Sequence, residues 1–272
     1  MRKIAGGRPG RAPEAAYGDI DLLLRNLSVL LVTDTADVET HSGVGSASFT
    51  LGSEIALVEA LLHDPAAAEL ALQTIRPDTS DPTIAAGTAL VRGILAAESG
   101  DTARAVTEME RFSVAYADPA VAWVNYGFHC WVAPAEEAAG HPDKADTVLK
   151  AGGTFVDCYR FRGDILDGRG DWKGAQEWYS KAVELAPDLP AGDYSWGVAL
   201  AKHGDLAGAE AKLRDANQRG PHWADPLKAW GDVLVKQGNA KGALVKYDEG
   251  LKYAPNWKQL KEARQAAANQ KT

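Results

Sequence analysis

Three segments of the chain repeat one pattern: GDILDGRGDWKGAQEWYSKAVELAP at residues 163–187, GVALAKHGDLAGAEAKLRDANQRGP at 197–221 and GDVLVKQGNAKGALVKYDEGLKYAP at 231–255. Each segment begins 34 residues after the one before it. The recurring columns are Gly163, Gly197 and Gly231; Leu166, Leu200 and Leu234; Gly170, Gly204 and Gly238; Ala175, Ala209 and Ala243; and Pro187, Pro221 and Pro255. A period of this length indicates a fold built from repeated supersecondary units.

One repeat has the pattern of two helices joined by a tight turn. Residues 156–167 carry apolar side chains at helical spacing, and Gly170 follows where a left-handed backbone can end a helix. Asp171 is placed to cap a second helix over 172–185. Pro187 ends that helix, because the residue before a proline disfavours helical dihedral angles. We therefore expect one antiparallel helix hairpin in each repeat.

Small side chains inside these helices predict close packing. A glycine in a helix costs about 1 kcal/mol relative to alanine, so Gly163 and its equivalents are expected where two helices nearly touch. Ala175 and its equivalents should face the same seam, while Tyr179, Leu213 and Tyr247 should pack each hairpin against the next. Since one hairpin cannot bury both of its faces, the hairpins are expected to stack.

These columns resemble the tetratricopeptide repeat (TPR) family: a glycine within the first helix, a large apolar residue three positions later, then alanine, an aromatic residue, alanine and proline. The resemblance is strong over residues 156–255, and residues 256–270 resemble the helix that caps such arrays. The chain departs from the family pattern at Tyr159, Asp193, Leu213, Leu227 and Gly250. The resemblance implies an all-α fold, an α-solenoid of stacked antiparallel helix hairpins that forms the TPR superhelix.

Weaker copies of the pattern precede the strong repeats. Gly100 and Gly140 are each followed by an alanine five residues later, as Gly170 is, and the spacing around Gly140 predicts a longer first helix. We therefore divide the chain into a disordered basic tail (1–12), a leading helix and flexible Gly/Ser loop (13–53), degenerate TPR-like hairpins (54–155), three TPR repeats (156–255) and a capping helix and tail (256–272).

Charge is unevenly distributed along the chain. With 29 basic and 37 acidic residues the formal charge is −8, which argues against general binding to nucleic acid or to anionic membranes. Residues 12–155 hold seven basic and 21 acidic residues, whereas 156–272 hold 18 and 16. The acidic part is either a solvated surface or a docking face for a basic partner. The apolar run Leu22–Val32 is too short to span a bilayer and does not follow the basic end as a secretory signal would, so we expect no membrane insertion and a cytoplasmic location.

Motifs for catalysis are weak. Gly43-Val44-Gly45 lacks the Gly-Lys-Ser/Thr ending of a phosphate-binding loop, so a flexible turn is favoured. His129 and Cys130 are neighbours that would point about 100° apart on a helix, and a small buried thiol beside an imidazole is the simpler interpretation. The eight tryptophans follow the repeat closely enough to favour packing between hairpins over ligand contact. We therefore expect that the protein is not an enzyme and that it has no catalytic residue, cofactor or metal site.

The resemblance places the binding surface in a concave groove lined by the first helix of each hairpin. The residues expected there are Asp157, Arg160, Asp164, Asp167, Tyr194, Val198, Lys202, Asp225, Lys228, Asp232 and Lys236. Some related co-chaperones clamp a terminal carboxylate with lysine and asparagine one turn apart. Arg160 with Asp164 is one of the corresponding pairs here, and an aspartate would repel a carboxylate, so a mixed-charge or basic peptide is favoured.

Two functions follow from these expectations. The first is a non-enzymatic TPR scaffold that binds a protein or peptide segment in its groove, with no nucleic acid as partner. The alternative is the carboxy-terminal regulatory part of a larger enzyme or transcription regulator. A third possibility, an enzyme that uses His129 and Cys130, is the least favoured.

Overall fold

The computed structural model describes residues 55–75, 82–117 and 128–270. The basic tail (1–12), the leading helix with its Gly/Ser loop (13–53) and the Gly43-Val44-Gly45 turn lie outside these ranges. The chain divides at Gly153 and Thr154 into two compact units. We call their described parts the amino-terminal unit (55–153, with the gaps given) and the carboxy-terminal unit (154–270). Within the described ranges all regular structure is helical, as expected for an all-α fold.

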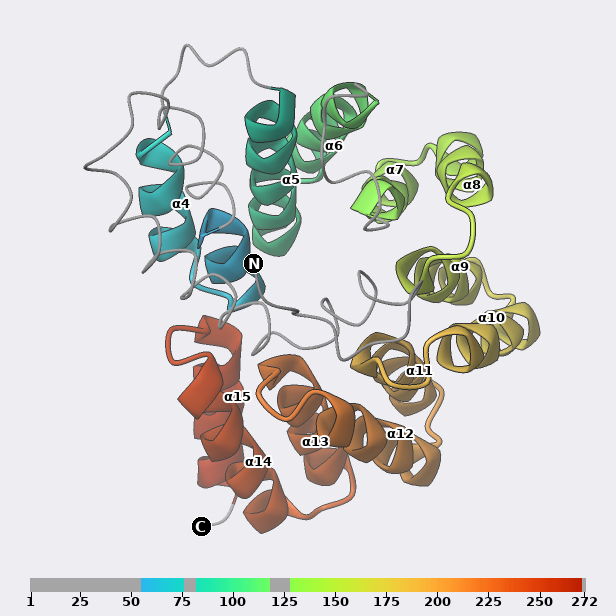
Figure 1. Cartoon of the computed structure of the whole chain (residues 1–272). Helices are drawn as coiled ribbons and strands as arrows, with labels where there is room; N and C mark the ends of the chain where they lie inside the picture. The colour runs from blue at the N-terminus through green and yellow to red at the C-terminus, as the bar shows by residue number, and fades with distance from the viewer. Residues whose placement is uncertain (1–54, 76–81, 118–127, 271–272) are drawn as a thin grey trace, which may run out of the picture. The chain divides into compact units, whose positions relative to one another are not determined.

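The carboxy-terminal unit contains three helix hairpins and a final helix. In Figure 1, the first helices of the hairpins follow one edge of this unit and the second helices follow the other. The helices are α9 (Val156–Gly168), α10 (Trp172–Leu185), α11 (Pro190–Lys202), α12 (Leu206–Arg219), α13 (Ala224–Lys236), α14 (Ala240–Tyr253) and α15 (Lys258–Asn269). The pairs α9/α10, α11/α12 and α13/α14 are the three repeats expected from the sequence.

Each hairpin turn is built from the same two devices. The glycines at the turn have positive φ angles, +87° at Gly170, +84° at Gly204 and +79° at Gly238, which side chains other than glycine rarely adopt. The next residue caps the second helix: Asp171 Oδ1, for example, accepts a hydrogen bond of 2.9 Å from the backbone N–H of Gly174. Asp205 and Asn239 cap α12 and α14 in the same way.

The glycines within the first helices lie directly beneath large side chains of the second helices. A Cβ atom on Gly163 would lie 2.5 Å from the Tyr179 ring, and one on Gly231 would lie 2.3 Å from the Tyr247 ring. These contacts lie within one hairpin, which the sequence did not indicate. Tyr179 also shares a buried cluster with Ala199 of the following hairpin, so the same side chain contributes to both packing layers.

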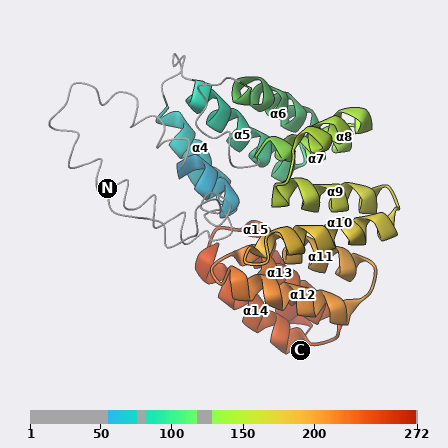
Figure 2. The same ribbon diagram turned by 45° about the vertical axis from the view of Figure 1, so that its right-hand side comes forward.

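The amino-terminal unit uses the same devices less regularly. Its helices are α4 (Pro65–Gln73), α5 (Pro82–Ser99), α6 (Thr102–Tyr116), η1 (Phe128–Trp131), α7 (Val132–Ala138) and α8 (Pro142–Ala151), and residues 55–61 are also helical. Figures 1 and 2 show α5 and α6 side by side as one hairpin. Gly100 has a φ of +78°, Asp101 caps α6, and a Cβ on Gly93 would lie 2.8 Å from the end of Met109.

The longer first helix expected before Gly140 lies partly on residues 118–127, outside the described ranges. A short 3-10 turn, η1, precedes a seven-residue α7. Pro134 explains the break, because a proline ring clashes with the carbonyl four residues earlier and tolerates only the first turn of a helix.

Within the described ranges, no helix combines the length and the apolar character that crossing a bilayer requires.

Candidate functional site

The residues predicted to bind a partner all lie on the first helices of the three repeats. We call them the inner-face residues: Asp157, Arg160, Asp164 and Asp167 on α9; Tyr194, Val198 and Lys202 on α11; and Asp225, Lys228, Asp232 and Lys236 on α13. Spacings of three or four residues place those of one helix on one side of it. Because α11 packs against both α9 and α13, the three rows adjoin one another.

Asp157, Arg160 and Asp164 form a largely buried ionic group at the start of α9. Arg160 Nε donates a hydrogen bond of 2.5 Å to Asp157 Oδ1, and its guanidinium lies over the ring of Phe161. Burial lowers the pKa of Arg160, but the charges of Asp157 and Asp164 outweigh burial and raise it overall. Burial raises the pKa of Asp164, and the charge of Arg160 only partly opposes that rise. This group is therefore a desolvated ionic cluster, with one acid held in an unfavourable environment.

Two inner-face aspartates accept hydrogen bonds from the tyrosines of their own hairpins. The Tyr179 hydroxyl donates to Asp164 at 2.8 Å, and the Tyr247 hydroxyl donates to Asp232 at 2.8 Å. In the middle repeat the corresponding pair is Val198 and Leu213, which can form no such bond. Val198 is instead 41% exposed at the centre of the face. The aspartates therefore help to close their hairpins, whereas Val198 is accessible to a partner.

Asp167 joins α9 to α11. Its carboxylate is buried and accepts hydrogen bonds from Lys202 Nζ at 2.8 Å and His203 Nε2 at 2.5 Å. Burial raises the pKa of Asp167, but the hydrogen bonds from Lys202 and His203 outweigh it, and the pKa is lowered overall. His203 also stacks on Trp172, with ring centroids 4.0 Å apart. Lys236 on α13 likewise contacts the preceding hairpin: its Nζ donates a hydrogen bond of 3.2 Å to the Ala201 carbonyl oxygen of α11.

Charged side chains from the hairpins on either side affect the pKa of Tyr194, which lies on α11. Burial raises the pKa of its hydroxyl, and the negative charge of Asp225 on α13 raises it further. Arg160 on α9 opposes the rise, while Asp164 and Asp232 add to it. The ring also packs against Trp223 at a centroid distance of 4.7 Å. The phenol therefore lies in a negative field to which α9 and α13 both contribute.

The inner-face residues thus separate into two groups along the helices. Around Tyr194 the structure assembles a mainly acidic group with Arg160 as its buried cation. Lys228 belongs to this end, since its Nζ donates to Asp232 at 2.7 Å. At the helix ends lie two exposed lysines, Lys202, which contacts the buried Asp167, and Lys236. Val198 lies one turn of α11 from Tyr194 and one turn from Lys202.

Sequence reasoning missed a buried acid on α11. The Asp193 side chain is 1% exposed and accepts a hydrogen bond from Lys212 Nζ at 2.9 Å and another from Arg219 Nη1. Lys212 and Arg219 are seven residues apart in the sequence, which places them on the same face of α12. That spacing, opposite an aspartate at a position where the chain departs from the TPR pattern, is the sequence signal that could have identified it.

A contact between a cationic side chain and a tryptophan ring recurs at equivalent positions in all three hairpins. In the first hairpin the cation is on the first helix and the tryptophan on the second, and in the other two hairpins the order is reversed. Arg162 of α9 lies 4.2 Å from the Trp178 ring of α10. In the next two hairpins the aromatic ring is on the first helix: Lys212 lies 4.2 Å from Trp196, and Lys246 lies 4.1 Å from Trp230. Trp196 and Trp230 also pack against the buried clusters between hairpins, as expected from their periodicity. These tryptophans therefore serve packing.

The described residues offer little support for intrinsic chemistry. Cys130 and Cys158 are both buried and neither is a free thiol, so the expected buried thiol is wrong and the least favoured hypothesis lacks its nucleophile.

Comparisons with known proteins agree with this architecture. No family model matches the chain, and none of the curated proteins matches it. Among solved structures, TTC0263, a thermophilic TPR protein of Thermus thermophilus, is 19% identical with a TM-score of 0.54, over 68% of this chain and 100% of that one. A chain of the APC/C hetero-tetramer Cut9–Hcn1 is 17% identical with a TM-score of 0.53, over 94% of this chain and 51% of that one. Yeast Tom70 is 12% identical with a TM-score of 0.53, over 100% of this chain and 67% of that one.

These likenesses are below 25% identity and establish the fold. The chain has the TPR fold, an all-α solenoid of helix hairpins, as the resemblance in the sequence implied. It spans about half the length of the Cut9–Hcn1 chain.

Proposed function

We propose that this chain is a protein-interaction scaffold and that its inner face binds a segment of a partner protein. The observation that carries the proposal is the arrangement around Val198. An exposed apolar side chain lies at the centre of a face to which three successive hairpins contribute charged and aromatic groups. A stack of hairpins offers such a continuous surface to an extended ligand.

The charges favour a mixed-charge segment. The acidic group around Tyr194 would attract a basic side chain, and the exposed amines of Lys202 and Lys236 would attract an acidic one. Val198 separates the two and would contact an aliphatic side chain. A segment with a basic residue, an aliphatic residue and an acidic residue in that order complements this face.

A carboxylate clamp is disfavoured for a specific reason. At the clamp positions the aspartates Asp164 and Asp232 accept hydrogen bonds from Tyr179 and Tyr247. A terminal carboxylate placed there would meet like charge without a free donor to offset it. We therefore propose binding to an internal segment of the partner.

Two exposed valines allow a matched test. Val198 is 41% exposed on the inner face, and Val245 is 61% exposed on α14, a second helix. On an array of peptides that combine basic, aliphatic and acidic residues, Val198→Arg should weaken binding about tenfold or more, because it places bulk and charge at the centre of the face. Val245→Arg should leave binding unchanged. Equal effects of the two substitutions, or no effect of either, would contradict the proposal.

The alternative, a regulatory part of a larger enzyme or transcription regulator, differs in a way that genomic DNA can reveal. It requires an adjoining catalytic or DNA-binding domain in the same reading frame. The cytoplasmic location and the exclusion of nucleic acid stay predictions from the sequence.

A further inference from the structure

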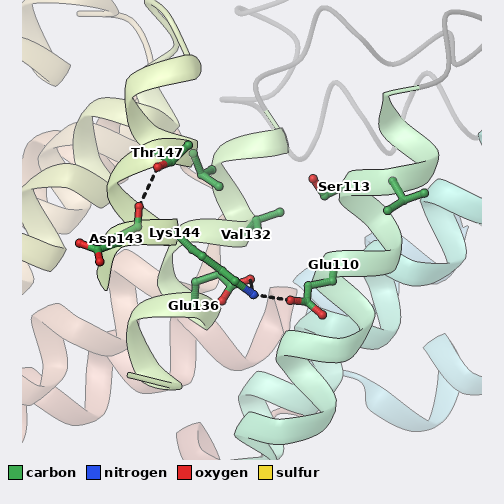
Figure 3. A pocket seen from close by; sticks show the side chains of 9 residues that line it. Glu110, Ser113, Val132, Glu136, Asp143, Lys144 and Thr147 are labelled. Carbon is green, nitrogen blue, oxygen red and sulfur yellow. Dashed lines mark hydrogen bonds and ion pairs between the residues drawn. The ribbon is translucent and has the colours of Figure 1, made fainter. Parts of the chain in front are cut away.

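A hollow lies within the amino-terminal unit. A cleft of about 600 Å³ opens between α6 on one side and α7 and α8 on the other. Figure 3 shows Glu110 and Ser113 of α6 facing Val132 and Glu136 of α7 and Lys144 of α8. All residues that line this cleft belong to the amino-terminal unit, whereas the inner-face residues all belong to the carboxy-terminal unit, so the two surfaces share no residue.

The polar lining of the cleft is mainly acidic. Glu110, Glu136 and Asp143 contribute three carboxyl groups, and Lys144 is the one ammonium group among the lining residues. Lys144 Nζ lies 2.7 Å from Glu110 Oε1 and 3.7 Å from Glu136 Oε1. Glu136 is buried, and its other carboxylate oxygen, Oε2, lies 2.8 Å from His141 Nδ1. The cleft therefore has more negative than positive charge.

Lys144 indicates what the cleft can hold. Its ammonium group already lies between carboxylates of two different helices, so this position suits a cation. The hydrogen bond from Lys144 lowers the pKa of Glu110, and the same bond raises the pKa of Lys144. The Lys144–Glu110 pair is about half exposed on both sides, and exposed pairs of this kind contribute little to stability, so an incoming cation can displace the lysine.

The apolar lining lies beside these charges. Val114 on α6 is 78% exposed, and Val132 and Val148 line the opposite side of the cleft. A single exposed valine is common on protein surfaces. Here, however, Val114 borders a cleft whose opposite wall also carries valines, and the Glu110 carboxylate lies in the same lining. That combination complements an aliphatic side chain adjacent to a basic one.

We propose that the cleft between α6, α7 and α8 binds a partner-protein segment in which an arginine or lysine stands next to aliphatic residues. The basic side chain pairs with Glu110, and the aliphatic side chains cover Val114 and Val148. The charge of the whole unit supports this choice of partner, since its described residues include eleven acidic and five basic side chains. A positively charged segment is therefore also attracted at long range.

The test uses the full chain and a defined panel of peptides. The panel consists of short acetylated, amidated peptides in which one arginine is moved stepwise relative to two leucines, with matched peptides carrying glutamate for arginine or serine for leucine. Fluorescence anisotropy should detect binding of arginine–leucine peptides, weaker at high salt, and none of the two matched sets. Glu110→Lys and Val114→Ser should each reduce the affinity about tenfold.

Neighbouring residues on α4 provide controls of the same type. Glu69 is exposed and Leu70 is 65% exposed, so Glu69→Lys and Leu70→Ser make the same changes outside the cleft and should leave the affinity unchanged. Failure of every arginine–leucine peptide to bind, or binding that survives both Glu110→Lys and Val114→Ser, would overturn the proposal. Equal binding of the glutamate peptides would overturn it too.

Discussion

At the scale of single residues, the packing of each hairpin depends on a glycine in its first helix. Gly163, Gly197 and Gly231 leave room for Tyr179, Leu213 and Tyr247 to lie across the first helix of their hairpins. The glycine column was predictable from the sequence, because a costly residue that recurs in a helix needs a steric reason. The partner that fills each space was not, because glycine gives no indication of which side chain covers it.

Two glycines of α9 test this explanation within one helix. A Cβ on Gly163 would lie 2.5 Å from the Tyr179 ring, whereas one on Gly168 would have no atom within 4 Å. Gly163→Ala should therefore lower the free energy of unfolding by about 1–3 kcal/mol, because overpacking outweighs the better helix propensity. Gly168→Ala should be neutral or slightly stabilising. Urea denaturation followed by tryptophan fluorescence measures both, and equal effects would contradict the steric account.

At the scale of helices, the hairpins are joined by polar contacts as well as by apolar packing. Asp164 bonds to Tyr179 of α10, and three residues later Asp167 bonds to Lys202 and His203 of α11. Helix limits such as 172–185 were predictable, because caps and prolines are local signals. The partners of the inner-face charges were not, because these contacts join residues as far as 36 positions apart and depend on how the helices pack.

The two aspartates of α9 should respond to pH in opposite ways. The lowered pKa of Asp167 means that its charged form favours folding, so its contribution is present at neutral pH and is lost as the pH falls through the folded-state pKa, below the ordinary 3.8. The raised pKa of Asp164 means that its charged form opposes folding, at a cost that appears as the pH rises above 3.8 and through the raised value.

Replacing each of these aspartates by asparagine separates their contributions to the free energy of unfolding. At pH 7 Asp167→Asn should reduce the free energy of unfolding, whereas Asp164→Asn should leave it unchanged or raise it, since asparagine can still accept the Tyr179 hydrogen bond. Each difference from the parent protein should shrink as the pH is lowered. Unfolding curves at a series of pH values measure this, and the same sign for both variants at pH 7 would refute the assignment.

At the scale of the molecule, both units use one hairpin design but expose different chemistry. The carboxy-terminal unit has nearly balanced charge, and most inner-face ions are paired within the protein. The amino-terminal unit is acidic and carries a cleft between α6, α7 and α8. The inner face was expected from the resemblance to TPR proteins, and helical spacing then selected the residues of each first helix. The cleft did not, since it depends on how far α6 lies from α7 and α8, which no repeat column reports.

The central functional claim is that a partner segment binds across α9, α11 and α13. Its most direct test is a titration of the isotope-labelled full chain with the tightest-binding mixed-charge array peptide, followed by assigned amide NMR spectra. We predict that the largest shifts fall on residues 157–167, 194–202 and 225–236, centred on Val198. Shifts that instead concentrate on α10, α12 and α14, or that leave Tyr194 and Val198 unchanged, would contradict the account.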